Sequence, residues 1–422
     1  MSTSSSHTLT PRRELWLLIT LAGIQFTNIL DFMIMMPLGP QFTKLFSIAD
    51  AQFGLLVSAY TLAGGVSGLL ASSYIDRFDR KRLMLVLYSL FALSTLACGL
   101  APGYYSLMAA RVAAGIFGGV LSSLSQTIVG DVIPFERRGR AMGIVMTSFS
   151  VSTVAGVPLG LYLAANFGWH TPFIAIAATC ALLTVFAALT MPSLNAHLHM
   201  HAPTSAWGRI SETLTDKNHQ RAFLFSAFLM FAGFTVIPYI TIYMQTNVGL
   251  TPAQVPMIYL TGGLATLLSA RWFGRLADSM GKFETFRLLA IAVVFPMAGI
   301  TLVPAVPLPL VLCVTTLFFV FMSGRMIPGM AILTSAGNPA MRGTFMTLNS
   351  AVQSAAMGLA ALVGGHLISR DAAGLVQNYW MAAAVGACAS VVAIFLAKGL
   401  NLHQGAMTRP DSVASPQGSV KP

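Results

Sequence analysis

The sequence predicts an all-α membrane protein of twelve transmembrane helices in two pseudo-symmetric six-helix bundles. Of its 422 residues, 55% are hydrophobic and 9% are charged, whereas about a quarter of the residues in a soluble domain are charged. Runs of roughly 20 apolar residues cross a hydrocarbon core of about 30 Å. Twelve such runs begin near residues 15, 54, 83, 104, 141, 170, 222, 255, 284, 308, 343 and 377.

These runs divide the chain into five segments. We expect a cytoplasmic N-terminal tail over 1–14, a six-helix bundle over 15–192, a cytoplasmic linker over 193–221, a second six-helix bundle over 222–398 and a cytoplasmic C-terminal tail over 399–422. The first run is followed by no small-residue cleavage site, so we interpret it as a retained helix.

The net charge of +11 is explained by membrane topology. With the N-terminus in the cytoplasm, nearly all Lys and Arg fall in cytoplasmic loops, and only Lys44 and Arg370 fall on the other side. This asymmetry is the positive-inside pattern. Both termini are therefore expected in the cytoplasm, and the charge implies no nucleic-acid partner.

No pattern in the sequence indicates a metal site, a cofactor or a disulfide. Each of the four cysteines falls within a predicted span. The linker histidines His197, His199 and His201 alternate in a way that can bind a transition metal. No carboxylate or thiol lies beside them, so a solvated loop is the preferred interpretation.

The two halves of the chain repeat each other weakly, as in transporters built from related bundles. After the second span Asp76 is followed four residues later by Arg80, and after the eighth Asp278 is followed by Lys282. An Arg-Gly pair also opens both the fifth and the eleventh span. Two similar motifs at corresponding positions of the two halves favour an internal duplication.

The loop after the second span resembles motif A of the major facilitator superfamily, G-x-x-x-D-R-x-G-R-K-x. Asp76, Arg77, Arg80 and Lys81 match it, while Asp79 stands where the family usually has a glycine. The second copy of the motif consists of Gly274, Asp278, Gly281 and Lys282.

Two further motifs support the same resemblance. Arg111 opens a stretch in the fourth span that matches motif B. In the fifth span, the stretch with Gly156, Pro158 and Gly160 resembles motif C, which is usually associated with proton-driven exporters. The whole set is most similar to the arabinose-efflux-permease-like and drug:proton antiporter branch.

The resemblance implies a secondary active transporter that works by alternating access. The expected partners are a small-molecule substrate, protons and the lipid bilayer, and the proton gradient is the expected driving force, with no cofactor. We expect proton-coupled efflux of a drug-like compound, sugar or metabolite by a monomer in a bacterial-type inner (plasma) membrane. The alternative is proton-coupled import of a small metabolite or siderophore-like compound.

A receptor or a membrane-embedded enzyme is a more distant alternative. An enzyme needs a nucleophile with a base, or a metal cluster, within the spans. His366, the histidine placed well inside a span, has no acid or thiol at helical spacing, and the sequence has no phosphate-binding loop pattern.

For motif A and its repeat, the resemblance implies a conformational latch between the bundles that holds the outward-facing state. The alternative is that these charges only set the topology. For motif C, small residues and a proline in one span predict close helix packing.

Asp31 and Arg111 are expected deep in the membrane, where an ionised side chain costs about 2.5 to 3.5 kcal/mol. At 1.5 Å per residue, Asp31 lies roughly 24 Å and Arg111 roughly 20 Å from the inner surface. The two side chains are therefore expected to meet and to couple transport to protons. Whether Asp31 carries the proton or only holds Arg111 in place stays open.

The remaining candidates are polar or aromatic residues that share a helix face at spacings of three or four. Arg325, in the tenth span, has three open roles: contact with an anionic substrate, pairing across the bundles, or bonds to backbone carbonyls. The candidates for the substrate cavity are Gln25, Asn28, Gln126, Tyr239, Tyr243, Arg325, Asn349 and Gln353.

Overall fold

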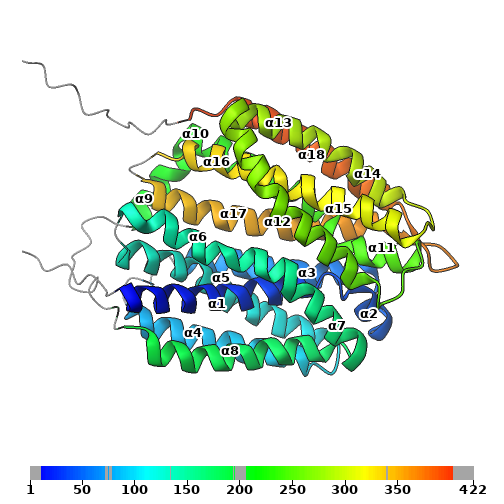
Figure 1. Ribbon diagram of the computed structural model, residues 1–422, viewed down its shortest axis with the longest axis horizontal. Helices are drawn as coiled ribbons and strands as arrows, with labels where there is room; N and C mark the ends of the chain where they lie inside the picture. The colour runs from blue at the N-terminus through cyan, green and yellow to red at the C-terminus, as the bar shows by residue number, and fades with distance from the viewer. Residues whose placement is uncertain are drawn as a thin grey trace, which may run out of the picture.

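The computed structural model describes residues 11–71, 75, 78–133, 135–192, 194, 206–338 and 341–402, and this part of the chain is nearly all helical (Figure 1). The elements of the first half are α1 (Pro11–Ile34), α2 (Gly39–Leu45), α3 (Asp50–Ala71), α4 (Arg80–Gly99), α5 (Tyr104–Val132), α6 (Phe135–Val151), the π-helical turn η2 (Ser152–Gly156), α7 (Val157–Phe167) and α8 (His170–Thr190).

The second half begins with α9 (Ala206–Thr215), α10 (Lys217–Phe234), the 3₁₀ turn η4 (Ile237–Tyr239) and α11 (Ile240–Thr246). It continues with α12 (Val255–Met280), α13 (Lys282–Ala292), α14 (Val294–Leu302), α15 (Leu308–Gly324), α16 (Met326–Ala336) and α17 (Arg342–Leu367). A short antiparallel hairpin of β1 (Ser369–Arg370) and β2 (Val376–Gln377) precedes α18 (Tyr379–Lys398).

Eleven candidate membrane spans, some of them built from two consecutive helices, are long and apolar enough among the described residues to cross a bilayer. They start within five residues of eleven of the predicted spans. The other predicted span forms α12, whose 26 residues are long enough. Arg271, Arg275 and Asp278 make α12 less apolar than the other eleven.

Prolines explain why four spans are interrupted. A proline has no backbone N–H, and its ring clashes with the carbonyl group four residues earlier. Helices α10, α13 and α15 end at Phe234, Ala292 and Gly324, each four residues before a proline. In the fifth span, the residue four positions before Pro158 lies inside η2, where the wider π-helical turn accommodates the ring.

The helices of each half pack mainly on one another, and Figure 1 shows the first half (blue to green) below the second (green to red). Three contacts join the halves among the described helices: α3 runs along α17, η2 with α7 packs against α12, and α2 packs on α11. We call the end of the molecule that carries α9 the α9 end, and the opposite end, with α2 and the hairpin, the α2 end.

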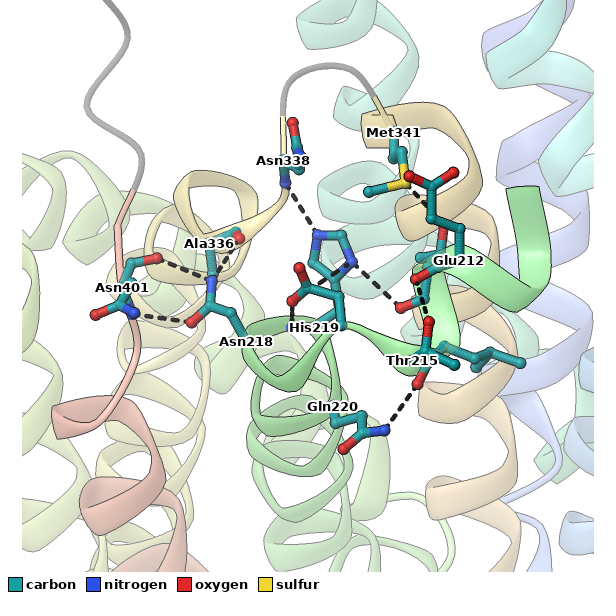
Figure 2. Close-up of polar contacts among 12 residues, drawn as sticks. Glu212, Thr215, Asn218, His219, Gln220, Ala336, Asn338, Met341 and Asn401 are labelled. Atoms are coloured by element: carbon teal, nitrogen blue, oxygen red, sulfur yellow. Dashed lines mark hydrogen bonds and ion pairs between the residues drawn. The ribbon is translucent and has the colours of Figure 1, made fainter. Parts of the chain in front are cut away.

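The end of the predicted linker is structured around the buried side chain of His219 (Figure 2). Its Nε2 accepts a hydrogen bond from the backbone N–H of Asn338 (3.0 Å), which places the ring proton on Nδ1, 3.3 Å from the carbonyl oxygen of Thr213. The ring also packs on Phe345, with centroids 4.8 Å apart. His219 therefore connects α9 and α10 to Asn338, just beyond the end of α16.

Helices α3 and α5 cross closely because glycines line their contact. A Cβ atom on Gly115 would lie 2.9 Å from the Cα of Tyr60, and a Cβ atom on Gly119 would lie 2.6 Å from the Cα of Gly64. Both distances are too short for real atoms. Only glycine at these positions lets the two backbones approach this far.

We expect Gly115→Ala to lower the thermal stability of the protein in detergent, because the added methyl group must push α3 away from α5 at about 1–3 kcal/mol. The matched control is Gly143→Ala in α6, where nothing lies within 4 Å of the added atom. Alanine favours a helix interior, so the control should match the wild type or exceed it. Equal midpoints for the Gly115 variant and the wild type would show that this crossing is not tight.

Candidate functional site

A cavity of about 410 Å³ lies between the two halves of the protein. Helices α1, α3 and α5 line it from the first half and α17 lines it from the second. It extends from Phe32, close to the end of α1, and Tyr60, near the middle of α3, to Thr127 and Gly343 towards the α9 end. Cavities of 300–1,000 Å³ suit drug-sized ligands.

Asp31 and Arg111 form a fully buried ion pair, with Nη1 of Arg111 2.9 Å from Oδ2 of Asp31. The same Nη1 donates to the backbone oxygen of Asp31 at 3.2 Å. The guanidinium carbon lies 4.3 Å from the ring centroid of Tyr60, a cation–π contact. The structure thus brings together the two charges that were placed at similar depth from the sequence.

The ion pair makes few of the hydrogen bonds that its atoms can form. Oδ1 of Asp31 and both Nε and Nη2 of Arg111 are buried without a hydrogen-bond partner in the described part of the chain. A buried pair repays its desolvation only with additional hydrogen bonds. This pair is therefore poorly explained as a device for stability alone.

A chain of hydrogen bonds connects the ion pair to the cavity. The hydroxyl group of Tyr60 donates to Oδ1 of Asn28 (2.7 Å), and Nδ2 of Asn28 donates to Oγ of Ser122 (3.2 Å). Ser122 in turn donates to Oε1 of Gln25 at 3.3 Å. Asn28 lines the cavity as expected, while Gln25 supports it through Ser122.

On α17 the residues that line the cavity differ from those expected. The polar lining residues are Thr347, Ser350 and Ser354. Asn349 is buried and outside the lining, and Gln353 donates to Oγ of Ser226 in α10 (2.9 Å). One residue turns a helix by about 100°, so the predicted pair faces α10. The cavity face of α17 is marked in the sequence by small polar residues three and four positions apart: Thr347, Ser350 and Ser354.

Three other candidates lie outside this cavity. Nη1 of Arg325 donates to Oγ of Ser390 (2.9 Å), and Nη2 donates to the carbonyl of Leu229 (3.1 Å). This guanidinium is buried inside the second half, which agrees with the backbone-binding role among the three left open. The hydroxyl group of Tyr239 donates to the carbonyl of Ala361, and that of Tyr243 to the carbonyl of Val303.

Comparison with known proteins identifies the family, because the model of the Major Facilitator Superfamily matches residues 21–361. The chain belongs to the Major Facilitator Superfamily. It is 25% identical over 360 residues to the protein named uncharacterized MFS-type transporter YceJ of Bacillus subtilis (strain 168). The aligned region covers 84% of this chain and 89% of that protein. It is 24% identical over 281 residues to Multidrug resistance protein 2 of the same strain, and this alignment covers 65% of this chain and 70% of that protein.

Solved structures of transporters share the fold. A D-xylose-proton symporter aligns with a TM-score of 0.74 at 16% identity, over 94% of this chain and 99% of that chain. A bacterial homolog of the human lysosomal transporter Spinster, inward-facing and occupied, aligns with a TM-score of 0.73 at 16% identity, over 92% and 97%. The predicted family is confirmed, and the protein is a multi-pass integral membrane transporter.

A salt bridge joins the two halves of the transporter at the α2 end. Two nitrogens of the Arg370 guanidinium donate to the carboxylate of Asp50: Nη2 to Oδ1 at 2.7 Å and Nε to Oδ2 at 2.9 Å. Asp50 is the first residue of α3, and Arg370 lies in the hairpin after α17. Farther along the same contact, Ser58 donates to the carbonyl of Gly358 (2.8 Å). From the sequence alone, Arg370 stands out only as an exception to the charge asymmetry.

Asp371 organises the turn that carries Arg370. Its carboxylate accepts hydrogen bonds from the backbone N–H of Leu375 (2.9 Å) and Ala373 (3.0 Å) and from the side chain of Gln377 (2.9 Å). These bonds, that of Leu375 first, lower the pKa of Asp371. The exposed carboxylate therefore stays ionised and keeps the turn in shape.

Motif A is described in part, since Asp76 and Arg77 lie outside the described residues. Asp79 caps α4, because its carboxylate accepts from the backbone N–H of Arg82 at 2.8 Å. Lys81 donates to the carbonyls of Ala188 (2.9 Å) and Met191 (2.7 Å) at the end of α8. Lys81 thus joins helices of one half, as a cation at a helix C-terminus does.

Arg80, the other described basic residue of motif A, is buried at the start of α4. Its backbone N–H donates to the carbonyl oxygen of Leu194 at 3.3 Å. This bond holds the chain after α8 against α4. Lys81 bonds within the first half, and the backbone of Arg80 bonds to Leu194 just after that half, so the latch between halves stays a prediction.

The repeat of motif A turns the chain from α12 into α13. Gly281 has φ +90°, a conformation that side chains other than glycine rarely adopt. Lys282 donates to Oγ of Ser335 in α16 at 3.3 Å. Asp278 is exposed, and nothing within 4 Å surrounds an atom added at Gly274.

The motif C segment packs in two directions. Gly156 faces Leu30 of α1, and Gly160 faces Ile34, with added Cβ atoms 2.9 Å and 2.6 Å from their side chains. The turn η2 that Pro158 causes lies against α12, where a Cβ atom on Gly263 would be 3.2 Å from the backbone of η2. Small residues therefore bring the fifth span close to both α1 and the second half.

We expect Arg370→Gln to open the α2 end. The buried carboxylate of Asp50 would keep half of its hydrogen bonds, which destabilises the contact between the halves by about 1–3 kcal/mol. In a protein whose native cysteines are replaced by serine, a Ser58→Cys probe should react with a membrane-impermeant maleimide at least about fivefold faster, the factor that corresponds to 1 kcal/mol. The matched control is Arg287→Gln, which breaks an exposed pair with Glu284 on α13. If both variants label at the wild-type rate, the Asp50–Arg370 pair does not hold this end closed.

Proposed function

We propose that this transporter exports a small molecule in exchange for protons. In this proposal α12 is a twelfth span, both termini lie in the cytoplasm, and the protein works as a monomer in a bacterial inner membrane. The positive-inside charge asymmetry supports the orientation. The relative named Multidrug resistance protein 2 and the motif C resemblance support export over import.

The observation that carries the proton coupling is the under-bonded ion pair of Asp31 and Arg111. An ionised carboxylate beside a guanidinium is favoured by the opposite charge and disfavoured by burial, and these effects oppose each other. Oδ1 of Asp31 has no hydrogen-bond partner in the described residues, so it can accept a proton without breaking the bond at Oδ2. Protonation removes one charge and loosens the hold of Asp31 on Arg111.

The hydrogen-bond chain through Tyr60, Asn28 and Ser122 links that change to the cavity. Tyr60 contacts the guanidinium with its ring and Asn28 with its hydroxyl group. A shift of Arg111 therefore changes the position of a residue on the cavity wall. Because binding affinities at coupled sites change reciprocally, substrate in the cavity changes the proton affinity of Asp31.

With this orientation, the present conformation is inward-facing. The cavity extends towards the α9 end, which is then cytoplasmic, while Asp50 and Arg370 close the outer end. Motif A would act in the opposite state, when the α9 ends of the two halves approach each other. The bundles rock around the contacts of α3 with α17 and of η2 with α12.

The proposal is tested in everted membrane vesicles with an imposed proton gradient, screened over dyes, sugars and organic anions. We expect at least one compound to accumulate uphill in the wild type. Asp31→Asn should abolish the uphill component and leave binding or exchange measurable, because an amide cannot carry the proton. Glu284→Gln, in an exposed pair, is the control and should transport normally.

The double variant Asp31→Asn with Arg111→Gln separates the two roles of Asp31. Arg111→Gln alone leaves a buried carboxylate unpaired and should cost about 3–5 kcal/mol of stability. The double variant removes both charges and should recover stability. If it also recovers uphill transport, Asp31 only neutralises Arg111 and the proposed proton site is wrong.

A further inference from the structure

We propose that the cavity binds an electrically neutral compound that combines an apolar, ring-containing body with a hydrogen-bonding group such as an amide or hydroxyl. This inference rests on the proposed function, because it names the substrate class of the same site. Three observations carry it: the charge of the cavity wall, the position of its free polar groups, and its apolar surfaces.

No described residue that lines the cavity carries a charge. The nearest charges are Asp31 and Arg111, which are fully buried and face each other. Arg325 is buried inside the second half on Ser390 and Leu229. An ion that entered this cavity would lose hydration without gaining a counter-charge, which disfavours charged ligands.

The wall offers three polar side chains that are not already used. Four of the eight hydroxyl groups on the described wall donate to a carbonyl of their own helix, as those of Thr127 and Thr347 do. Gln126 on α5 and Ser350 and Ser354 on α17 make no hydrogen bond within the described part of the chain.

These three groups lie on opposite walls of the cavity. Ser350 and Ser354 are four residues apart and share one face of α17, and Gln126 belongs to the wall formed by α5. An amide and two hydroxyl groups both donate and accept. They therefore suit a ligand group that also does both, rather than a carboxylate or an ammonium ion.

The rest of the wall is apolar and adaptable. Phe32 stacks on Tyr60 with centroids 5.5 Å apart, and both residues line the part of the cavity that lies farthest from the α9 end. Met346 and Met357 line the wall formed by α17. Aromatic faces and flexible thioethers suit a flat apolar body, and about 410 Å³ is enough for one of drug-like size.

The test measures binding to the purified full-length protein in detergent without a proton gradient. The probes share one ring system and differ in charge: 1-naphthylacetamide, 1-naphthylacetate and 1-(1-naphthyl)ethylamine. We expect the neutral amide to bind at least tenfold more tightly than either ion. Ser350→Ala and Ser354→Ala should each weaken its binding by about two- to tenfold, the effect of one hydrogen bond.

Gln126→Glu is the sharpest variant, because it adds a charge at almost constant volume. It should reverse the preference, so that the amine binds more tightly than the amide. Ser269→Ala in α12, whose hydroxyl group bonds to its own helix outside the cavity, is the matched control and should bind all probes as the wild type does.

The outcomes separate this inference from the proposed function. Wild-type preference for the anion or the cation, no binding of the amide up to millimolar concentration, or an unchanged order in Gln126→Glu would overturn the neutral class. Amide binding without gradient-driven transport in vesicles would leave the class standing and remove proton-coupled export.

Discussion

The cost of an ionised side chain in hydrocarbon is the constraint on which the first half of this transporter depends. Asp31 on α1 and Arg111 on α5 must lie together, because either charge alone costs several kcal/mol at that depth. Their contact brings α1 against α5, and the ring of Tyr60 brings α3 to the same point. These are the three helices that form one side of the cavity. The charge pair and the ligand site are thus parts of one packed unit.

Helix α3 packs on α5 within its own half with one face and on α17 of the other half with the opposite face. Towards α5, glycines let the backbones approach so closely that one methyl group would separate them. Towards α17, the contact includes the partly exposed Asp50–Arg370 salt bridge, one hydrogen bond from Ser58 and further glycines, since an added Cβ atom on Gly358 would lie 2.8 Å from the side chain of Leu62. Alternating access needs two states that differ by a few kcal/mol. The backbones of α3 and α5 meet with no side chain between them, which suits two helices that move together as one rigid body.

The sequence predicted the helices well because hydropathy is a local property. Counting residues along the first and fourth spans also placed Asp31 and Arg111 at similar depth in the membrane, where the structure brings them into contact. It did not predict the helix phase of α17. Asn349 and Gln353 were predicted to line the cavity because they are the larger polar residues, whereas Ser350 and Ser354 line it in the structure. The Asp50–Arg370 pair joins residues 320 positions apart, which no local pattern reveals. The helix breaks, in contrast, follow from prolines that the sequence shows directly.

A neutral cavity beside a titratable ion pair has a consequence for energy coupling. If one proton enters for each neutral molecule that leaves, each cycle moves one net positive charge inward. The membrane potential then adds about 2.3 kcal/mol per 100 mV to the driving force, equivalent to about a fifty-fold substrate gradient. A monovalent cation leaving in the same cycle would cancel that charge movement and leave only the pH difference. The uncharged wall made by Gln126, Ser350 and Ser354 therefore bears on the driving force as well as on the choice of substrate.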